Sequence, residues 1–352
     1  MLFNLIKFLK KKISFKKRFE LQLKSKSIFN KLINKNIHAV FIDLNSYAPS
    51  FNYVEYLLYA RLISKNKNLF LIVLPKENFS KVGVKEKKDY YFYLRVKTIL
   101  KPLIDLIIGK DATIIYAQNR LDMEPFFNLP SENKFPRDAS INKINDTYIY
   151  AKELLQLMKK NKERLKIKVN INLTNYIKEN LLINSKKKLI SISIKYNNYR
   201  SYMNSNIKVW KKFGEWLRLK NYDVIYLSDI ENLNILKQLN EPKFYSIAYL
   251  SSFDLEFRSA FYNLPNLNFI TAGGLGSLFF YSDNNYVITK FVSIKNKDAV
   301  GTGSLNLIKE HIGLDVNSQF PFSHKKQKIL WEPNSENFEN LKKIFKSFEH
   351  KI

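Results

Sequence analysis

The sequence contains no cysteine, which excludes disulfides and thiolate metal sites and is compatible with a reducing compartment. Its four histidines, His38, His311, His324 and His350, are scattered without the spacing of metal ligands. We therefore expect no zinc centre and no other bound metal or cofactor. Glycine is also scarce, with nine residues in the whole chain, so a cluster of glycines is a local signal.

No segment is long and apolar enough to span a bilayer, so the body of the chain is expected to be soluble and cytoplasmic. In residues 1–20, apolar side chains recur at helical spacing and are followed by runs of lysine. This pattern predicts an amphipathic helix that lies on an anionic membrane surface, at the inner face of the membrane. A solvated basic tail is the alternative.

Acidic residues are few: 31 of them face 59 basic residues, which gives a formal net charge of +28. Such a charge favours nucleic-acid binding. Two features oppose that interpretation. First, lysine outnumbers arginine by 50 to nine and Asn, Ile, Phe and Tyr are abundant, which is the composition that A/T-rich codons produce. Second, the charge is uneven, since residues 1–36 hold eleven basic residues and one acidic residue, Glu20. We expect no specific nucleic-acid partner.

From residue 37 onward, strand-like and helical segments alternate. In the first half the strand patterns cover 37–44, 69–74 and 112–117. The helical patterns cover 53–64, 94–108, 145–165 and 173–183. Between them, residues 118–142 form a long stretch with three prolines and no regular pattern, and a stretch of that kind is often functional.

A second alternation starts at Lys188, with strand patterns at 189–195, 223–229, 244–249 and 267–271. Strands separated by helices favour right-handed βαβ units around a parallel sheet. The sequence therefore predicts an α/β protein with two Rossmann-like domains, residues 37–184 and 185–332, that face a cleft. A basic segment, residues 1–36, precedes them, and a C-terminal helix, residues 333–352, follows.

A glycine-rich turn follows the strand pattern that ends at Thr271, and three of the nine glycines lie within it. Gly273, Gly274, Gly276 and Ser277 stand between this strand and a second apolar segment. Backbone N–H groups at the start of a helix attract phosphate, and glycine permits a positive φ and a close approach of the ligand. The turn predicts a phosphate site, with a plain strand-to-helix connection as the alternative.

Polar side chains follow the predicted strands of the second domain, and the carboxyl ends of parallel strands meet at one edge of a sheet. Arginine at such an edge suits phosphate binding. Each residue also has a structural explanation: Ser205, Asn206 and Asp254 fit helix caps, and Glu256 fits an ion pair with Arg258 or a lysine. Together they predict a site for an anionic small molecule. The set is Arg200, Ser205, Asn206, Ser228, Asp229, Ser251, Ser252, Asp254, Glu256 and Arg258.

Several of these residues belong to a longer series of motifs between residues 189 and 340. The series runs through residues 190–195, Arg200, Ser205-Asn206, Trp210, residues 213–217, residues 223–229, Asp254, Glu256, Arg258, Tyr262, Gly273-Gly274, Gln319, Pro321, Phe322, Gln327, Trp331 and Glu332. It resembles the second domain of GT-B glycosyltransferases, in particular a group of bacterial surface-carbohydrate transferases. The first half matches more faintly, through Arg95, Pro102, Arg120 and Phe135-Pro136.

The resemblance implies a nucleotide-sugar donor site in the second domain. Gly273, Gly274, Gly276 and Ser277 would face the diphosphate, and Arg200 would neutralise it. Asp229 or Glu256 would hold ribose or sugar hydroxyls. Ser205, Asn206 and Arg258 complete the expected donor site.

The resemblance also implies a glycan or lipid-linked acceptor on the first domain. An inverting transfer needs a base beside the acceptor hydroxyl. Asp43, at the end of the first strand, and Glu124, in the long stretch, are the candidates, with a surface acid or a cap as the alternative for each. Because the chain has no Asp-x-Asp motif, a metal-independent route fits better.

Three other functions remain open from the sequence. A nucleotide-sugar epimerase of the same two-domain build would act on its bound sugar without an acceptor. A non-catalytic protein that binds membranes or nucleic acid through its basic charge would show steep salt dependence. A degenerate transferase would bind the sugar without turnover.

Overall fold

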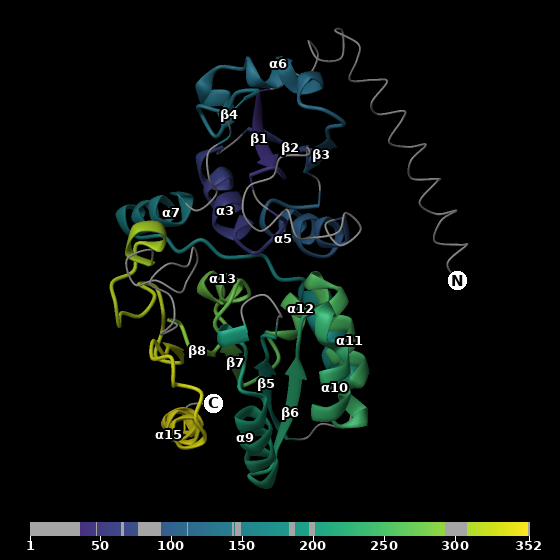
Figure 1. Ribbon diagram of the computed structural model, residues 1–352, viewed down its shortest axis with the longest axis vertical. Coiled ribbons are helices and arrows are strands. Elements are labelled where there is room, and N and C mark those ends of the chain that lie inside the picture. The colour runs from purple at the N-terminus through teal and green to yellow at the C-terminus, as the bar shows by residue number, and fades with distance from the viewer. Residues whose placement is uncertain are drawn as a thin grey trace, which may run out of the picture. The chain divides into compact units, whose positions relative to one another are not determined.

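The computed structural model describes residues 36–46, 48–64, 67–76, 93–110, 112–142, 144, 149–182, 187–196, 201–292 and 308–350 (Figure 1). The chain divides into two compact units, each made from three stretches. The first unit draws on Met1–Ala48, Ala60–Lys87 and Asp111–Asp146, and the second on Pro49–Tyr59, Lys88–Lys110 and Thr147–Ile352. The expected amphipathic segment, residues 1–20, lies outside the described residues.

The first unit contains a parallel sheet with the strand order β3-β2-β1-β4. Its strands are β1 (Ile37–Asp43), β2 (Asn68–Leu74), β3 (Thr113–Tyr116) and β4 (Lys134–Phe135). Every residue of β1 is buried, as a strand covered on both faces requires. The expected irregular stretch at 118–142 contains short helical turns, Leu121–Met123 and Ser131–Asn133, the helix α6 (Glu124–Phe127) and β4.

The second unit contains a five-stranded parallel sheet with the order β6-β5-β7-β8-β9. Its strands are β5 (Lys188–Ser193), β6 (Tyr222–Leu227), β7 (Leu267–Thr271), β8 (Tyr286–Thr289) and β9 (Gln327–Ile329). Strands β6 and β7 are buried along their whole length, including the polar residues Asp223 and Asn268, as strands covered on both faces are. The two parallel α/β sheets confirm the expected fold class.

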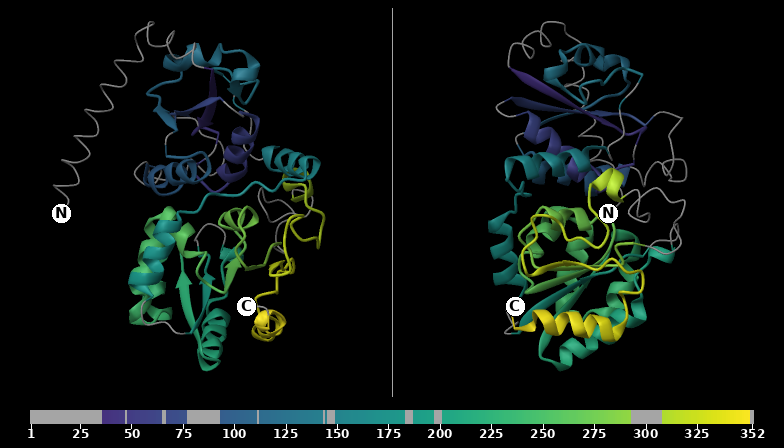
Figure 2. Two further views of the ribbon diagram at one scale, coloured as in Figure 1. Left: turned by 180° about the vertical axis from the view of Figure 1, so that it is seen from behind. Right: turned by 90° about the vertical axis from the view of Figure 1, so that its left-hand side faces the viewer.

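Helices of the second unit pack on this sheet. Figure 1 shows α10 (Leu233–Leu239), α11 (Tyr245–Phe253) and α12 (Leu255–Phe261) stacked beside β6. Helices α9 (Ile207–Leu219) and α15 (Phe338–Glu349) lie side by side (Figure 2). Phe213 of α9 joins them to the sheet, with its ring 5.1 Å from Phe269 of β7 and 6.3 Å from Phe345 of α15. These aromatic contacts fix both helices on the strands.

Other helical elements complete the described chain. They are α3 (Tyr53–Ile63), the π-turn Val96–Leu100 that leads into α5 (Lys101–Ile107), α7 (Ile149–Asn161), α8 (Ile171–Tyr176) with the π-turn Ile177–Leu181, α13 (Gly276–Phe280), the π-turn Ile308–Ile312 and the 3-10 turns Ser201–Met203, Ile230–Asn232 and Pro242–Phe244. Across the described ranges, no helix combines the length and the apolar composition that crossing a membrane requires.

The strand expected at 244–249 is wrong, because these residues lie in the turn Pro242–Phe244 and in α11. The buried residues Phe244, Ile247, Ala248 and Ser251 recur at the spacing of a helix face. A short apolar run fits either element, and Pro242 at the start of the turn favours the helical one. Strands β8 and β9 were not expected from the sequence.

Candidate functional site

The strand order of the second sheet creates one position at which ligands commonly bind. The chain passes from β5 to β6 on one side of β5, and returns to β7 on its other side. Such a reversal opens a crevice at the carboxyl ends of the two central strands, here β5 and β7. Lys195 follows β5 at this point, and the glycine turn follows β7.

Lys195 is held at this crevice by its backbone and its side chain. Its N–H donates to Ser205 Oγ at 2.8 Å, and the N–H of Ser205 donates to Lys195 O at 2.8 Å. Its ammonium Nζ donates to Ala272 O at 3.0 Å, so the side chain crosses from β5 to β7. A positive charge therefore stands at the switch point, although sequence reasoning did not select this lysine.

The glycine turn is built differently from the expectation, because Gly273, Gly274 and Gly276 all lack a positive φ. Glycine serves close packing instead. A β-carbon on Gly273 would stand 3.3 Å from Lys195 Cδ, and one on Gly274 would stand 2.9 Å from Phe51 Cβ. Gly276 is looser, with Ile288 Cδ1 at 3.6 Å. The small residues let Lys195 and Phe51 approach the backbone.

Several N–H groups of the turn are used within it. Those of Gly276, Ser277 and Leu278 donate to carbonyls three residues earlier, at 2.9, 3.1 and 3.1 Å. A phosphate at this turn would therefore meet the N–H groups that precede Gly276 rather than those of α13 itself. The cation of Lys195, which lies along Gly273, is the stronger attraction for an anion here.

Ser277 carries a second contact that the sequence did not reveal. The carboxyl of Glu55, on α3, forms a hydrogen bond with its side chain. Burial raises the pKa of Glu55 from 4.5 to about 7, although the bond to Ser277 opposes the rise. Burial, followed by the charge of Glu55, also raises the pKa of the Tyr281 hydroxyl. A carboxyl that titrates near neutrality suits proton transfer, which makes Glu55 a candidate of its own.

Arg258 and Asp229 meet beyond the carboxyl end of β6. The guanidinium Nη1 of Arg258 lies 3.3 Å from Asp229 Oδ1 and 3.2 Å from Ser228 O, and its Nε donates to Tyr262 OH at 2.8 Å. Burial opposes the charge, yet Tyr262 and Asp229 raise the pKa of Arg258, which stays protonated. Its Nη2 is buried without a hydrogen-bond partner among the described residues. This group offers a donor to a ligand.

A second arginine, Arg95, interacts electrostatically with the carboxylate of Asp229. Arg95, ahead of the π-turn at Val96, donates from Nε to Pro49 O at 2.8 Å. Burial lowers its pKa, and the charge of Asp229 opposes that change. The carboxyl end of β6 thus combines two guanidinium groups with one aspartate, whose side chain is 51% exposed. An excess of positive charge suits an anionic ligand.

Glu256 is committed to a different contact. Its Oε1 lies 2.8 Å from Lys110 Nζ and accepts a hydrogen bond of 2.8 Å from Asn170 Nδ2. The bond from Lys110 lowers the pKa of Glu256, so the carboxyl is ionised. Of the two ion-pair partners weighed from the sequence, the lysine is the observed one. Asp254 caps α12 by accepting from Phe257 N at 3.0 Å, as its position suggested.

Ser205 and Asn206 stand at the start of α9. Asn206 caps this helix through Val209 N at 3.3 Å, and Ser205 Oγ lies 2.5 Å from Thr271 Oγ1. Asn206 N donates directly to Glu336, and Ser205 reaches Glu336 through Thr271. Glu336 is a buried carboxylate ahead of α15 that the sequence did not single out. Arg200, the cation expected here, lies outside the described residues.

The two expected catalytic acids lie in the first unit. Asp43, at the end of β1, is buried, and its Oδ1 is 2.5 Å from Arg120 Nη2. It also accepts from Asn45 N at 3.0 Å and from Ser46 Oγ at 2.8 Å, so its carboxylate is firmly oriented. Glu124 is exposed at the first position of α6. Asp43 and Glu124 are therefore different in kind, one fixed and one solvated.

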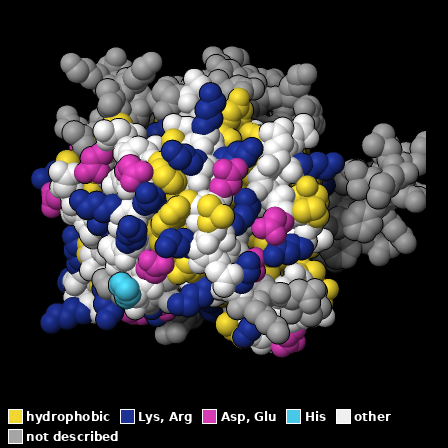
Figure 3. All heavy atoms as spheres, turned by 90° about the horizontal axis from the view of Figure 1, so that it is seen from below, with side chains coloured by type: hydrophobic (Ala, Val, Ile, Leu, Met, Phe, Trp, Pro, Cys, Tyr) yellow, Lys and Arg dark blue, Asp and Glu magenta, His cyan; other side chains and the backbone are white. Residues whose placement is uncertain are grey.

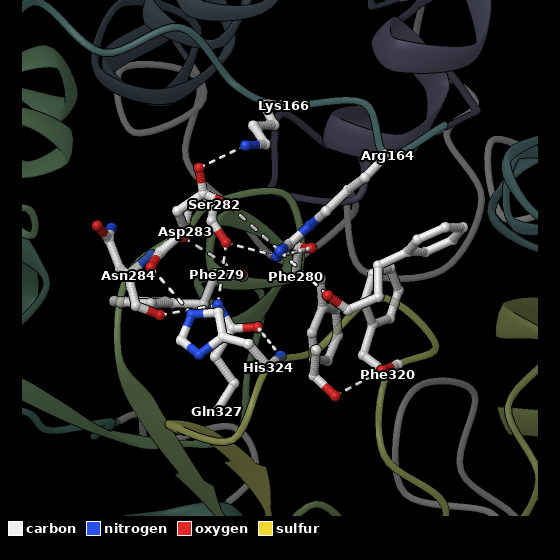
Figure 4. Close-up of polar contacts among 12 residues, drawn as sticks. Arg164, Lys166, Phe279, Phe280, Ser282, Asp283, Asn284, Phe320, His324 and Gln327 are labelled. Carbon is white, nitrogen blue, oxygen red and sulfur yellow. Dashed lines mark hydrogen bonds and ion pairs between the residues drawn. The ribbon is translucent and has the colours of Figure 1, made fainter. Parts of the chain in front are cut away.

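Arg164 anchors the chain that follows α13 (Figure 4). Its Nη2 donates to Phe280 O at 2.9 Å and to Ser282 O at 2.5 Å, and its Nη1 donates to Phe322 O at 3.2 Å. Burial lowers its pKa, and the charge of Asp283 opposes this. A cation at the carboxyl end of a helix satisfies its last carbonyls. Arg164 thereby holds the far end of the helix that carries Ser277.

On the face drawn in Figure 3, basic side chains are dispersed rather than gathered in one block. Figure 3 shows Lys and Arg interspersed with apolar, uncharged and some acidic residues on one face. Exposed lysines of α9 and α15 include Lys208, Lys211, Lys343 and Lys346.

Neither a family model nor a curated protein sequence matches the chain. Solved structures of low sequence identity do resemble it. A glycosyl transferase of family 9 from Veillonella parvula is 10% identical, with a TM-score of 0.45 over 90% of this chain and 99% of that chain. The ADP-heptose LPS heptosyltransferase II of E. coli is 8% identical, with a TM-score of 0.46 over 90% of this chain and 99% of that chain.

A third similar structure is the E. coli heptosyltransferase WaaC with ADP-2-deoxy-2-fluoro heptose. It is 12% identical, with a TM-score of 0.40 over 88% of this chain and 99% of that chain. At these scores the likeness carries nothing about individual residues, whose roles rest on the contacts above. The three structures are a glycosyl transferase and two heptosyltransferases, and none of them is more than 12% identical to this chain.

Proposed function

We propose that this protein is a glycosyltransferase that takes a sugar from a nucleotide-sugar donor bound at the carboxyl edge of the second sheet. The observation that carries the proposal is the position of Lys195 Nζ. It bridges to Ala272 O at 3.0 Å at the switch point between β5 and β7, where α/β sheets bind nucleotides. The leaving diphosphate needs positive charge at this point.

Each residue of this edge has a role in the proposal. Lys195 and Arg200 neutralise the diphosphate, and Gly273 leaves the room in which the Lys195 side chain lies. The buried Nη2 of Arg258 gives a hydrogen bond to the nucleotide-sugar, and Asp229 accepts one from a ribose or sugar hydroxyl. Ser205 and Asn206 support the edge through their bonds, and Glu256 supports it through Lys110.

We expect the transfer to be independent of metal, because lysine and arginine supply the charge that a metal would otherwise supply. Within the described part of the chain, no three His, Cys, Asp or Glu side chains gather as a metal site. Chelation with EDTA should therefore leave turnover unchanged. Loss of turnover that Mg²⁺ or Mn²⁺ restores would contradict this.

The base that activates the acceptor hydroxyl is proposed from three carboxyl groups. Asp43 and Glu124 come from the sequence. Glu55 is added because its carboxyl bonds to the side chain of Ser277 beside the glycine turn and has a raised pKa of about 7. A substitution of each by the isosteric amide separates them. The true base should lose turnover by about 10²–10⁴-fold while donor affinity is kept.

Calorimetric titration with UDP, ADP, GDP and CDP tests the donor site. We expect one of them to bind the wild-type protein, and its sugar derivatives to bind as well. If none binds, the donor-site proposal fails. Product analysis with a sugar derivative of that nucleotide then separates the alternatives. An epimerase changes the sugar without an acceptor, and a degenerate transferase binds without any product.

The basic, non-catalytic alternative predicts binding to nucleic acid or membranes that falls steeply with salt, and no nucleotide affinity. We propose that membrane attachment is instead confined to residues 1–20, beside a glycan or lipid-linked acceptor, and that the protein is otherwise cytoplasmic. Removal of residues 1–20 should abolish binding to anionic phosphatidylglycerol vesicles and leave nucleotide binding intact. Equal vesicle binding by the shortened protein would refute this.

A further inference from the structure

Glu336 is a buried carboxylate that accepts hydrogen bonds from the carboxyl ends of two strands and from the start of a helix. Its Oε1 accepts from Thr271 Oγ1 at 2.5 Å and from Thr289 Oγ1 at 2.9 Å, at the last residues of β7 and β8. Its Oε2 accepts from Asn206 N at 2.8 Å, and Lys290 Nζ lies 3.8 Å from that oxygen. Three hydrogen-bond donors and one ammonium group therefore surround this carboxylate.

The hydrogen bonds that lead away from Glu336 have a fixed direction. A carboxylate only accepts, so the proton of the Thr271 hydroxyl points to Glu336. Ser205 Oγ lies 2.5 Å from Thr271 Oγ1, and Thr271 has no second proton to give. Ser205 must therefore donate to Thr271. Its oxygen is then left to accept from Lys195 N–H, as is observed at 2.8 Å.

The result is a directed chain from Lys195 N–H to Ser205, from Ser205 to Thr271, and from Thr271 to Glu336. Every hydroxyl in it donates once, and the chain ends on a group that only accepts. Ser205 is 6% and Thr271 3% exposed, so water competes little for these bonds. Reversal at any link would place two donors or two acceptors face to face.

We propose that Glu336 is a positioning residue for the ammonium group of Lys195, acting through Thr271 and Ser205. The chain fixes the backbone of Lys195, and the bond from Ser205 N to Lys195 O fixes it from the other side. The side chain is then directed along Gly273 to Ala272 O. The segment ahead of α15 thereby completes a site formed by residues far earlier in the sequence. The ligand part of this inference rests on the proposed function.

The test uses three substitutions in the full-length protein. Thr271→Val keeps the size of the side chain but removes the central hydroxyl, and Thr271→Ser restores it. Thr289→Val is the matched control, because Thr289 also bonds to Glu336 but lies outside the directed chain. The exchange rate of the Lys195 amide hydrogen measures, without any ligand, how firmly the hydrogen-bond chain holds this amide. The Ile190 and Ile192 amides of β5 serve as internal references.

Thr271→Val should speed exchange of the Lys195 amide by about tenfold or more, since a lost hydrogen bond of average strength corresponds to that factor. Thr271→Ser and Thr289→Val should leave its exchange within about threefold of wild type. Unchanged exchange in Thr271→Val would overturn the inference, whatever the ligand results. If Thr271→Val does not fold, Thr271→Ala replaces it, because alanine also removes the central hydroxyl.

Titration with the nucleoside diphosphate that binds the wild type tests the positioning role. Thr271→Val should weaken that affinity by about tenfold, with Thr271→Ser and Thr289→Val close to wild type. Faster exchange with unchanged affinity would show that the hydrogen-bond chain exists but does not position the ammonium group of Lys195 for the ligand. That result would overturn the inference. Absence of nucleotide binding to the wild type would refute the proposed function instead. The exchange result would still show whether the hydrogen-bond chain holds the Lys195 amide.

Discussion

The side chain of Lys195 lies along Gly273, with its Cδ 3.3 Å and its Nζ 3.4 Å from the position that a β-carbon on Gly273 would occupy. This contact joins the ends of β5 and β7, which are adjacent in the sheet but distant in the sequence. A glycine is needed here to leave a path for a lysine rather than to adopt an unusual backbone conformation.

Lys195→Met should weaken binding of the nucleoside diphosphate by about 10–100-fold, because a hydrogen bond to a charged group contributes about 1.5–3 kcal/mol. Methionine keeps the apolar stem, so the thermal unfolding midpoint should stay close to wild type. Lys208→Met is the control, since it removes the same charge from an exposed site on α9. Calorimetric titration of both variants measures the difference, and equal affinities would place the diphosphate elsewhere.

Gly214→Ala should destabilise the second unit, although alanine favours a helix by about 1 kcal/mol. A β-carbon at Gly214 would stand 1.8 Å from Tyr226 OH, and this hydroxyl is buried and donates to Trp210 O at 2.9 Å. Overpacking of this kind costs about 1–3 kcal/mol of unfolding free energy. Urea unfolding followed by tryptophan fluorescence measures it, because Trp210, Trp216 and Trp331 all lie in the second unit.

Tyr226→Phe removes the hydroxyl, the nearest of the blocking atoms, and leaves the ring carbon Cζ at 2.8 Å, so it tests how much of that loss the hydroxyl causes. In the double variant with Gly214→Ala, the two effects should fall short of their sum by about 0.5–3 kcal/mol. Strict additivity would mean that the alanine acts through something other than Tyr226.

Arg164→Met should lower the unfolding free energy of the second unit by roughly 2–3 kcal/mol, because the carbonyls of Phe280 and Phe322 lose their donor and Ser282 O keeps only Gln327 Nε2. Lys166→Met is the matched control. Lys166 Nζ pairs with Asp283 Oδ2 at 2.6 Å, but both side chains are more than half exposed, so this pair should contribute less than about 1 kcal/mol. Similar losses in the two variants, again measured by urea unfolding, would contradict the anchoring role.

Glu55 should make the stability of the second unit fall as pH rises. Its pKa is about 7 in the folded protein against 4.5 ordinarily, so the folded state holds the proton more tightly. The stabilisation is complete below pH 4.5 and is lost as pH rises through 7, by at most about 3 kcal/mol. Glu55→Gln should remove this dependence when urea unfolding is compared at pH 5 and pH 8. An unchanged pH dependence in Glu55→Gln would show that another group titrates.

The central part of the second sheet was predictable because apolar residues recur at strand spacing in β5, β6 and β7 and helical patterns separate these strands. Strands β8 and β9 escaped prediction because they are short, and β9 lies in a polar stretch after a long connection. The segment from Phe244 to Tyr249 was misassigned because its apolar residues satisfy both periods over so few positions. The fold class survived this error, since the other strands already required a parallel sheet.

The site was predictable only in outline. Chain order placed Ser205, Asp229 and Gly273 at one edge, because carboxyl ends of parallel strands converge. It gave no means of choosing Lys195 among 50 lysines. Nor did it indicate that Glu55 meets Ser277, or that Glu336 meets Thr271, because such contacts depend on tertiary packing between distant segments. The donor-site assignments themselves, and the domain boundaries, stay predictions.

The second unit is assembled from stretches of chain that are synthesised at very different times. Phe51 and Lys110 belong to early stretches, yet their partners Gly274 and Glu256 are translated much later. At ~5–20 residues per second, this delay is on the order of tens of seconds. During that interval the nascent chain carries apolar faces whose partners do not yet exist. Production of this protein should therefore depend strongly on chaperones that hold unfinished chains, and a single cut in the gene cannot yield the second unit intact.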